Sequence, residues 1–359
     1  MAQTKTILIT GGAGFIGSHL ALTLKKINPQ NEIISLDNFS RNGSRLNIPK
    51  LEAARVRVLE EDVRNREAIL SLKNINLIID CAAEPSVMAG RDEKVLEIVD
   101  INLNGTMNSL ELARQQKADF IFLSTSRVYP IETIDDLKVE ETETRFNLKP
   151  DQKITGVSKN GINEDFPLQP EKNRTLYGAT KLAAEFLIRE YATNFGIKTV
   201  INRCGLISGA GQFGKSDQGV VALWVASHYF GKPLSYIGYG GTGKQTRDIL
   251  HVEDLSEAID WQIRNLEKSN GQIFNLGGGL KNSLSLREMT NICQEITGRK
   301  VSISPVKDGR AGDIKIYITD YSKFKTLSGW EPKRTAKKTV TDLFKWISEN
   351  KNELEKVLT

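Results

Sequence analysis

The sequence predicts an α/β protein with a doubly wound parallel sheet and a smaller second α/β lobe. Two patterns carry this prediction. Short apolar runs that suit buried strands alternate with segments of helical period from residue 6 to residue 202, and this alternation is typical of parallel sheets with right-handed crossovers. The first apolar run also leads directly into a glycine cluster and a helix. Ligands are therefore expected beyond the carboxyl ends of the strands.

The glycine cluster follows the first predicted strand, Thr6–Thr10. Gly12, Gly14 and Gly17 have the spacing G-x-G-x-x-G, and the segment of helical period begins at Ser18. In a Rossmann-type turn of this spacing, one glycine makes the tight turn, one admits a pyrophosphate close to the backbone, and one lets helix and strand pack closely. The N–H groups at the positive end of the helix would then bind the pyrophosphate. A purely structural glycine turn is the alternative.

The second predicted strand, Glu32–Leu36, ends in Asp37, twenty positions after Gly17. A carboxylate at this place accepts hydrogen bonds from the ribose of an adenosine and repels a 2′-phosphate. The sequence therefore favours NAD over NADP, although the nearby Arg41 and Arg45 leave NADP open.

Three further strands and a helix complete this part of the pattern, at Val56–Leu59, Leu77–Cys81, Asp119–Ser124 and, for the helix, from about residue 93 to residue 116. Asp62 follows one of these strands and could bind the adenine amino group, while Val63 covers the ring. Ala82 and Ala83 follow another, and such small residues would let the backbone lie close to a cofactor.

The candidate catalytic residues come after the fifth strand. Tyr177 and Lys181 begin a helix that runs to about Asn194, and residues four apart on a helix lie on one face. A lysine ammonium beside the phenol favours the phenolate, so Tyr177 could act as a base near neutral pH. Thr125, at the end of the strand, would hold the substrate oxygen in line with it. Tyr-x-x-x-Lys occurs by chance in many helices, but here it follows the glycine cluster and Asp37 in order, which favours catalysis.

Composition excludes several classes of protein. The 359 residues are 39% hydrophobic and 26% charged, as in an ordinary globular protein of more than one domain. The net charge of +5 contains no Lys/Arg run, which argues against a nucleic-acid-binding tail but suits an anionic substrate. No apolar run reaches membrane-spanning length, so no membrane partner is expected.

The three cysteines, Cys81, Cys204 and Cys293, lie far apart without C-x-x-C spacing. This spacing supports neither a zinc site nor a disulfide framework, and no other metal site is predicted. It fits a reducing compartment. Because the first strand begins near the N-terminus and leaves little room for a signal peptide, we expect a cytoplasmic protein.

Several motifs together indicate a family. They are the glycine cluster, Asp37-Asn38, Asp62-Val63, Asn102 in Asn-x-Asn-Gly-Thr, Tyr177 with Lys181, Gly209-Ala210-Gly211, the segment from Arg247 to Asp254, and Arg310-Ala311-Gly312-Asp313. With these, nearly the whole chain resembles the extended short-chain dehydrogenase/reductases of the NAD-dependent nucleotide-sugar epimerase and dehydratase group. The resemblance implies NAD as cofactor, a nucleoside-diphosphate-sugar substrate and a homodimer.

Within this group, the chain departs from the dehydratases. They resemble one another in an Asp-Glu pair after the strand-end hydroxyl, and this chain has Ser126-Arg127 there, so an acid/base pair for eliminating water is missing. Thr125-Ser126-Arg127-Val128-Tyr129 instead resembles the CDP-paratose (CDP-tyvelose) 2-epimerases, as do stretches at 141–145, 216–219, 243–248 and 282–286. Leu206 stands where 4-epimerases commonly have asparagine.

The resemblance implies an NAD-dependent epimerase that acts at C2 of a CDP-hexose. A UDP-sugar 4-epimerase is the first alternative, a 4,6-dehydratase is less favoured, and a non-catalytic NAD-sensing protein comes last. The expected catalytic residues are Thr125, Arg127, Tyr177 and Lys181. The expected NAD contacts are Gly11, Gly14, Phe15, Ile16, Gly17, Asp37, Asn38, Ser40, Arg41, Asp62, Val63, Ala82, Ala83, Asn102, Tyr177, Lys181 and Cys204. The expected substrate contacts are Ser126, Arg127, Lys215, Gln218, Arg247 and Arg310, of which the last two would clamp the diphosphate unless they form surface ion pairs.

The predicted NAD-binding domain comprises residues 1–202 plus 246–278, and the nucleotide-sugar-binding lobe comprises residues 203–245 plus 279–359. From Tyr129 to Tyr177 there are 48 positions, an unusually long polar connection. A connection of this length is usually functional or disordered. It could form a lid over the sugar, or a surface or oligomer-contact loop.

Overall fold

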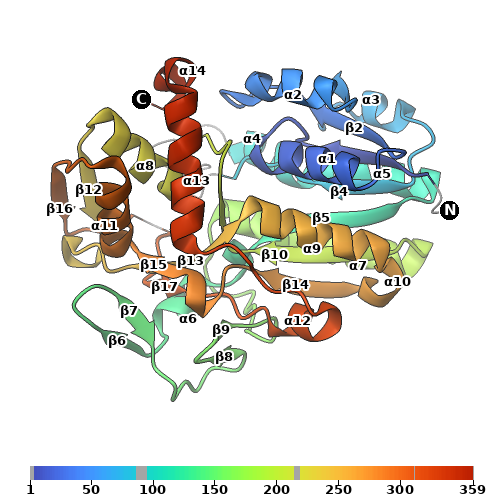
Figure 1. Ribbon diagram of the computed structural model, residues 1–359. Coiled ribbons are helices and arrows are strands. Elements are labelled where there is room, and N and C mark those ends of the chain that lie inside the picture. Colours follow the sequence, from blue (N-terminus) through green and yellow to red (C-terminus); the bar gives the residue numbers. More distant parts are fainter. Residues whose placement is uncertain (1–3, 86–94, 214–218, 311, 359) are drawn as a thin grey trace. The chain divides into compact units, whose positions relative to one another are not determined.

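The computed structural model describes residues 4–85, 95–213, 219–310 and 312–358 (Figure 1). The chain forms two compact units. Unit 1 comprises Met1–Thr125, Leu176–Arg203 and Leu255–Phe274, and unit 2 comprises Ser126–Thr175, Cys204–Asp254 and Asn275–Thr359.

Unit 1 is built on a seven-stranded sheet. Its strands, in spatial order, are β14 (Gln272–Leu276), β10 (Thr199–Cys204), β5 (Asp119–Thr125), β4 (Leu77–Asp80), β1 (Thr6–Thr10), β2 (Glu32–Asp37) and β3 (Arg57–Glu60). The strand pairs from β3 to β5 run parallel, and the order reverses between β1 and β4. The doubly wound sheet predicted from the sequence is thereby confirmed.

Helices of unit 1 connect these strands and pack on the sheet (Figure 1). They are α1 (Phe15–Ile27), α2 (Ile48–Ala53), α3 (Arg66–Ser71), α4 (Val95–Val99), α5 (Gly105–Gln116), α7 (Leu176–Phe195), α9 (Val252–Arg264) and α10 (Leu266–Ser269). The single helix predicted over residues 93 to 116 is interrupted, because Asp100–Asn104 form a π-helical turn between α4 and α5. Such turns are rare and often lie at functional sites.

The core between α5, α7 and the sheet explains why these segments fold as they do. Phe120 and Phe122 of β5 and Ile201 of β10 pack with Ala184 and Ile188 of α7, and all five are buried. The strand residues alternate with period two and the helix residues lie one turn apart, so each element presents one apolar face. Burying a side chain of this size contributes about 1.5–3 kcal/mol, and the contact orients α7 on β5.

Unit 2 has its own small sheet around β13 (Thr246–His251). β11 (Leu206–Ser208) and β17 (Ile316–Tyr317) pair with β13 in parallel and β15 (Ser283–Ser285) pairs antiparallel. Its helices are α6 (Ile131–Asp135), α8 (Val220–Phe230), α11 (Leu286–Thr297), α12 (Ser322–Ser328), α13 (Ala336–Glu349) and α14 (Lys351–Leu358). Two-stranded sheets join β12 (Leu234–Ile237) to β16 (Ile303–Val306), β6 (Val139–Glu141) to β7 (Phe146–Leu148), and β8 (Val157–Ser158) to β9 (Gly161–Ile162). α11 begins with a capping box in which Ser285 and Glu288 bind each other's backbone N–H groups, as Ser-x-x-Glu predicts.

The units divide the chain differently from the predicted domains. The long connection, residues 126–175, was expected in the NAD-binding domain and belongs to unit 2, as do residues 246–254 and 275–278, while residue 203 belongs to unit 1. The physical reason is long-range pairing: Phe146 packs against Ile316 and Ile318, and the Ile162 N–H donates to the Ile318 carbonyl at 2.8 Å. The connection therefore carries short helices and strands of unit 2, and its role as a lid stays a prediction.

Candidate functional site

The glycine turn after β1 is tightly packed at most of its glycines and least tightly packed at Gly14. Gly11 has a φ of +61°, and a Cβ there would lie 2.9 Å from the Cα of Ala82. A Cβ at Gly17 would lie 2.2 Å from the Gly11 carbonyl oxygen, whereas at Gly14 the same oxygen, at 3.1 Å, is the nearest neighbour. The turn thus needs glycine at Gly11, Gly12 and Gly17 for packing, whereas Gly14, the residue that caps α1, is half-buried and has more room. A glycine turn at the start of a helix is the arrangement that could hold a pyrophosphate.

Asp37 lies at the end of β2 beside this turn. Its carboxylate accepts hydrogen bonds from the N–H groups of Ala13 at 3.1 Å and Phe39 at 2.8 Å. Burial raises the pKa of the Asp37 carboxyl, and these backbone hydrogen bonds oppose the increase. The position is the one predicted for the ribose contact.

Asp62 is held by neighbouring side chains. Arg64 donates to both of its carboxylate oxygens, and the amide of Asn38 donates at 2.7 Å. The hydrogen bonds from Arg64 are the main reason why the pKa of Asp62 is lowered to about 2. The Arg64 backbone N–H also donates to it, so an adenine amino group would join an acid that already accepts four hydrogen bonds.

A buried acid that the sequence analysis did not single out fixes the turn after β4. The Thr10 hydroxyl donates to Asp80 at 2.5 Å, and the Thr106 hydroxyl donates to its other oxygen at 2.7 Å. Thr10 also accepts from the N–H groups of Cys81 and Ala82, each at 3.2 Å. These contacts hold Ala82 against Gly11 at the place where the strand order reverses. The signal was present in the sequence, as a carboxylate that ends an apolar strand.

Asn102 connects the segment after β4 to α7. Its side-chain amide pairs with the backbone of Glu84, at 2.8 and 3.1 Å, and donates to the Thr180 hydroxyl at 3.3 Å. Thr180 lies between Tyr177 and Lys181. The fully buried Asn102, predicted as an NAD contact, thus orders the backbone around the candidate catalytic helix.

Of the four candidate catalytic residues, Thr125, Tyr177 and Lys181 belong to unit 1, and Arg127 belongs to unit 2. Thr125 is the last residue of β5, Tyr177 is the second residue of α7, and Lys181 follows one turn later. α7 packs against β5. Lys181 is only 1% exposed, and its Nζ lies 4.0 Å from the ring centroid of Phe122. This cation–π contact restrains the ammonium, and Phe122 is a residue that the sequence analysis did not single out.

The candidate substrate residues that the structure describes lie in unit 2. Arg127 donates to the carbonyl of Gly312 at 2.8 Å. Arg247 donates to Asp313 at 3.0 Å and to the carbonyl of Ile314, so it takes part in the ion pair that was the alternative to a clamp. Ser126 precedes Arg127 in a 3-10 turn, and Arg310 is exposed. Cys204, which was predicted as an NAD contact, is buried and also belongs to unit 2. Lys215 and Gln218 lie outside the described residues.

The sequence profile of the NAD dependent epimerase/dehydratase family matches residues 7–277. The chain belongs to this family. It is 31% identical over 356 residues to the CDP-paratose 2-epimerase of Salmonella typhi, covering 95% of this chain and 99% of the relative. It is 29% identical to the UDP-glucose 4-epimerase of Corynebacterium glutamicum, covering 94% and 93%.

Solved structures agree with this family assignment. The UDP-glucuronic acid 4-epimerase of Bacillus cereus, solved with UDP-glucuronic acid and NAD, is 26% identical, with a TM-score of 0.78 over 96% of this chain and 99% of its own. The UDP-glucose 4-epimerase of Thermus thermophilus, solved with NAD, has a TM-score of 0.76 at 25% identity over 96% and 99%. The predicted family, fold class and cofactor are confirmed. NAD is the cofactor of this family member, and the glycine turn before α1, with Asp37 beside it, fits this cofactor.

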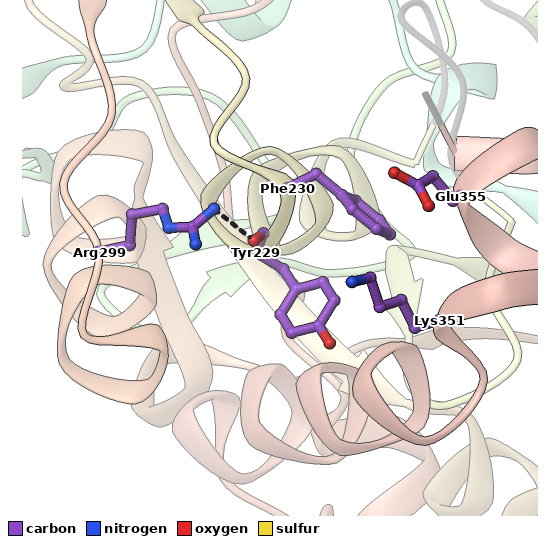
Figure 2. A pocket seen from close by; sticks show the side chains of 5 residues that line it. All are labelled: Tyr229, Phe230, Arg299, Lys351 and Glu355. Atoms are coloured by element: carbon purple, nitrogen blue, oxygen red, sulfur yellow. Dashed lines mark hydrogen bonds between the residues drawn. The ribbon is translucent and has the colours of Figure 1, made fainter.

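A separate hollow of about 250 Å³ lies in unit 2 (Figure 2). It is lined by Tyr229, Phe230, Arg299, Lys351 and Glu355, and Arg299 donates to the Tyr229 carbonyl at 2.8 Å. None of these residues belongs to the predicted site. Among the described residues, no group of three or more His, Cys, Asp and Glu side chains could hold a metal ion, and no helix that they form combines the length and apolar character needed to cross a membrane.

Proposed function

We propose that this protein is an NAD-dependent epimerase that inverts C2 of a CDP-hexose. The observation that carries the proposal is the set Thr125, Tyr177 and Lys181 within one unit, at the end of β5 and on the first turns of α7. The likeness to the CDP-paratose 2-epimerase of Salmonella typhi over nearly the full length of both chains supports the choice of substrate.

The chemistry that these residues supply is proton transfer. NAD⁺, when bound, supplies a hydride acceptor that can return the hydride. Tyr177, as a phenolate, takes the proton of the sugar hydroxyl while the C–H bond of the same carbon is broken, and gives the proton back when that bond is remade on the opposite face. Lys181 stabilises the phenolate, and Thr125 holds the reacting oxygen with a hydrogen bond.

Two residues favour an epimerase over a dehydratase. Elimination of water from a sugar needs an acid and a base besides Tyr177. The residues after Thr125 are Ser126 and Arg127, and a guanidinium does not release its proton in proteins. Arg127 also donates to a backbone carbonyl. We propose that it contacts the sugar or polarises the keto group of the intermediate.

The diphosphate of the substrate would bind to cations of unit 2. We propose Arg247 and Arg310 as its contacts, because a guanidinium can donate two hydrogen bonds to phosphate oxygens. In the structure Arg247 donates to Asp313, so the substrate would take the place of this carboxylate. Lys215 and Gln218 remain further candidates.

The second candidate function is that of a UDP-sugar 4-epimerase, which the relative from Corynebacterium glutamicum favours. Both functions use the same three residues on different carbons. Purified protein should be incubated with CDP-glucose and, separately, with UDP-glucose, without added NAD, and the products followed by NMR. A 2-epimer of the CDP-sugar supports the proposal, and UDP-galactose as the main product would replace it with the alternative.

We also propose that the protein is a homodimer. Leu96 of α4 is 75% exposed and Phe186 of α7 is 52% exposed, and the two helices pack against each other. A second copy could cover these exposed apolar side chains. Light scattering should give twice the chain mass of 40.0 kDa, and the double variant Leu96→Lys/Phe186→Lys should be a monomer.

A further inference from the structure

A buried ion pair joins the helix that carries Tyr177 and Lys181 to the neighbouring strand β10. Arg203 of β10 donates from Nη2 to Glu185 Oε2 at 2.7 Å and from Nε to both carboxylate oxygens at 3.1 Å. The Ser124 hydroxyl of β5 donates to Glu185 Oε1 at 2.5 Å. Glu185 is 1% exposed and Arg203 is 3% exposed. The predicted chemistry uses none of these three residues.

The position of Glu185 on α7 connects this cluster to the site. Tyr177, Lys181 and Glu185 are spaced by four residues, so they follow one another along the same side of the helix. On β5, Phe122 and Ser124 are two residues apart and therefore share a face of the sheet. Lys181 contacts the first and Glu185 the second. Ser124 also directly precedes Thr125.

We propose that Glu185 is a positioning residue, which sets the rotation and axial register of α7 on β5 so that Tyr177 and Lys181 face Thr125. The inference rests on the proposed function. Its physical basis is the contrast between apolar and ionic contacts. Apolar packing by Ala184 and Ile188 stabilises the helix without strong directionality, whereas a carboxylate that receives hydrogen bonds from both Ser124 and Arg203 is restricted in place and orientation.

The free-energy cost of burying these two charges also supports a positioning role for Glu185. Removing two charges from water is expensive, and a well-packed apolar group of similar volume is often as stable or more stable than a buried ion pair. Glu185 and Arg203 therefore add little net stability to α7. What they add is a geometric restraint that reaches the end of β5 through Ser124.

The same strand offers a matched control on its other face. Asn202 precedes Arg203 on β10, and successive side chains of a strand point to opposite faces. Its amide exchanges two hydrogen bonds, of 2.9 and 2.7 Å, with Gln262 of α9, and both residues are fully buried. This pair joins β10 to a different helix, so breaking it should cost stability without moving α7.

The experiment compares Ser124→Ala and Glu185→Gln with Gln262→Met, in the full chain with NAD bound. We expect Ser124→Ala and Glu185→Gln to lower kcat by about 10- to 100-fold, since a misplacement of about 1 Å can cost about 10²-fold, while KM stays unchanged. Gln262→Met should keep the parental kcat although its melting temperature falls. Parental kcat in both cluster variants, or an equal loss of kcat in Gln262→Met, would overturn the proposal. If Glu185→Gln fails to fold, the kcat of Ser124→Ala alone tests the proposal: a fall supports it, and a parental value overturns it.

A second readout does not depend on activity. Crystal structures of the parent and of Ser124→Ala give the distance from the Tyr177 hydroxyl to the Thr125 hydroxyl, and we expect it to change by at least about 0.5 Å, the tolerance of a productive site. An unchanged distance would overturn the positioning role. A parent that epimerises no nucleotide sugar would refute the proposed function instead, and this distance would still test Glu185.

Discussion

The two units hold their candidate ligand contacts in different ways. In unit 1 the backbone takes part: the Gly11 turn lies against Ala82, and the buried Asp37 accepts hydrogen bonds from two N–H groups. In unit 2, Arg247 and Asp313 form an ion pair whose side chains are 18% and 26% exposed. Partly exposed ion pairs contribute little stability and exchange partners easily. On the proposed function, unit 1 is preorganised for its cofactor, whereas the cations of unit 2 would bind the substrate by exchanging partners.

The largest effect is expected for Tyr177→Phe, which tests whether unit 1 carries the chemistry. If unit 1 carries the chemistry on a preorganised site, kcat should fall by about 10²- to 10⁴-fold, the usual contribution of a general acid or base, while bound NAD is retained. Steady-state kinetics and the nucleotide released on denaturation measure both. Tyr191→Phe, on the same helix, is the control and should keep activity. Unchanged turnover in Tyr177→Phe would revive a non-catalytic, NAD-sensing role.

Unit 2 is tested by Arg247→Ala. Loss of a charge-assisted hydrogen bond costs about 1.5–3 kcal/mol, so KM for the nucleotide sugar should rise roughly 10- to 100-fold with little change in kcat. Asp313→Asn should lower KM, because it removes the internal competitor for Arg247. If Asp313→Asn raises KM as much as Arg247→Ala does, the pair is structural and the exchange idea fails.

The glycine turn separates packing from ligand binding. Gly17→Ala places a Cβ against the Gly11 carbonyl and should destabilise the protein by about 1–3 kcal/mol, as overpacking does. Gly14→Ala should cost less stability but release NAD, because its methyl group would enter the expected pyrophosphate site. Urea unfolding of the NAD-free variants and the NAD content of the purified proteins distinguish the two. Retained NAD in Gly14→Ala would contradict this expected site.

The smallest effect concerns Asp62. Its pKa in the folded protein is lowered from 3.8 to about 2, mainly by hydrogen bonds from Arg64. An acid with a depressed pKa stabilises the fold fully above its unfolded value, and this stabilisation is lost as the pH falls through the folded value. The free energy of unfolding should therefore fall less steeply between pH 3.8 and about pH 2 in Asp62→Asn than in the parent. Parallel curves would show that Asp62 has no such role.

The sequence was most informative where chemistry and backbone geometry coincide. The glycine turn, Asp37 and the Tyr177 helix were predicted because each depends on a local spacing. Asp80, Phe122 and the pair Glu185 and Arg203 were missed, because their roles arise from partners far away in the chain.

The same reason explains why the two compact units differ from the predicted domains. A polar connection with several prolines indicates a loop, and only tertiary pairing assigns residues 126–175 to unit 2. The ion pair of Arg247 with Asp313 also could not be predicted from the sequence, because the two residues are brought together only by the fold, although each belongs to a family motif.

The most direct test of the account follows a label. Protein purified without added NAD should be given a CDP-hexose that carries deuterium at C2, and the product analysed by NMR and mass spectrometry. We predict a 2-epimer that retains the deuterium at C2, because the hydride removed from this carbon returns to it while Tyr177 handles the proton. Loss of the label to solvent, or no inversion at C2, would contradict the account.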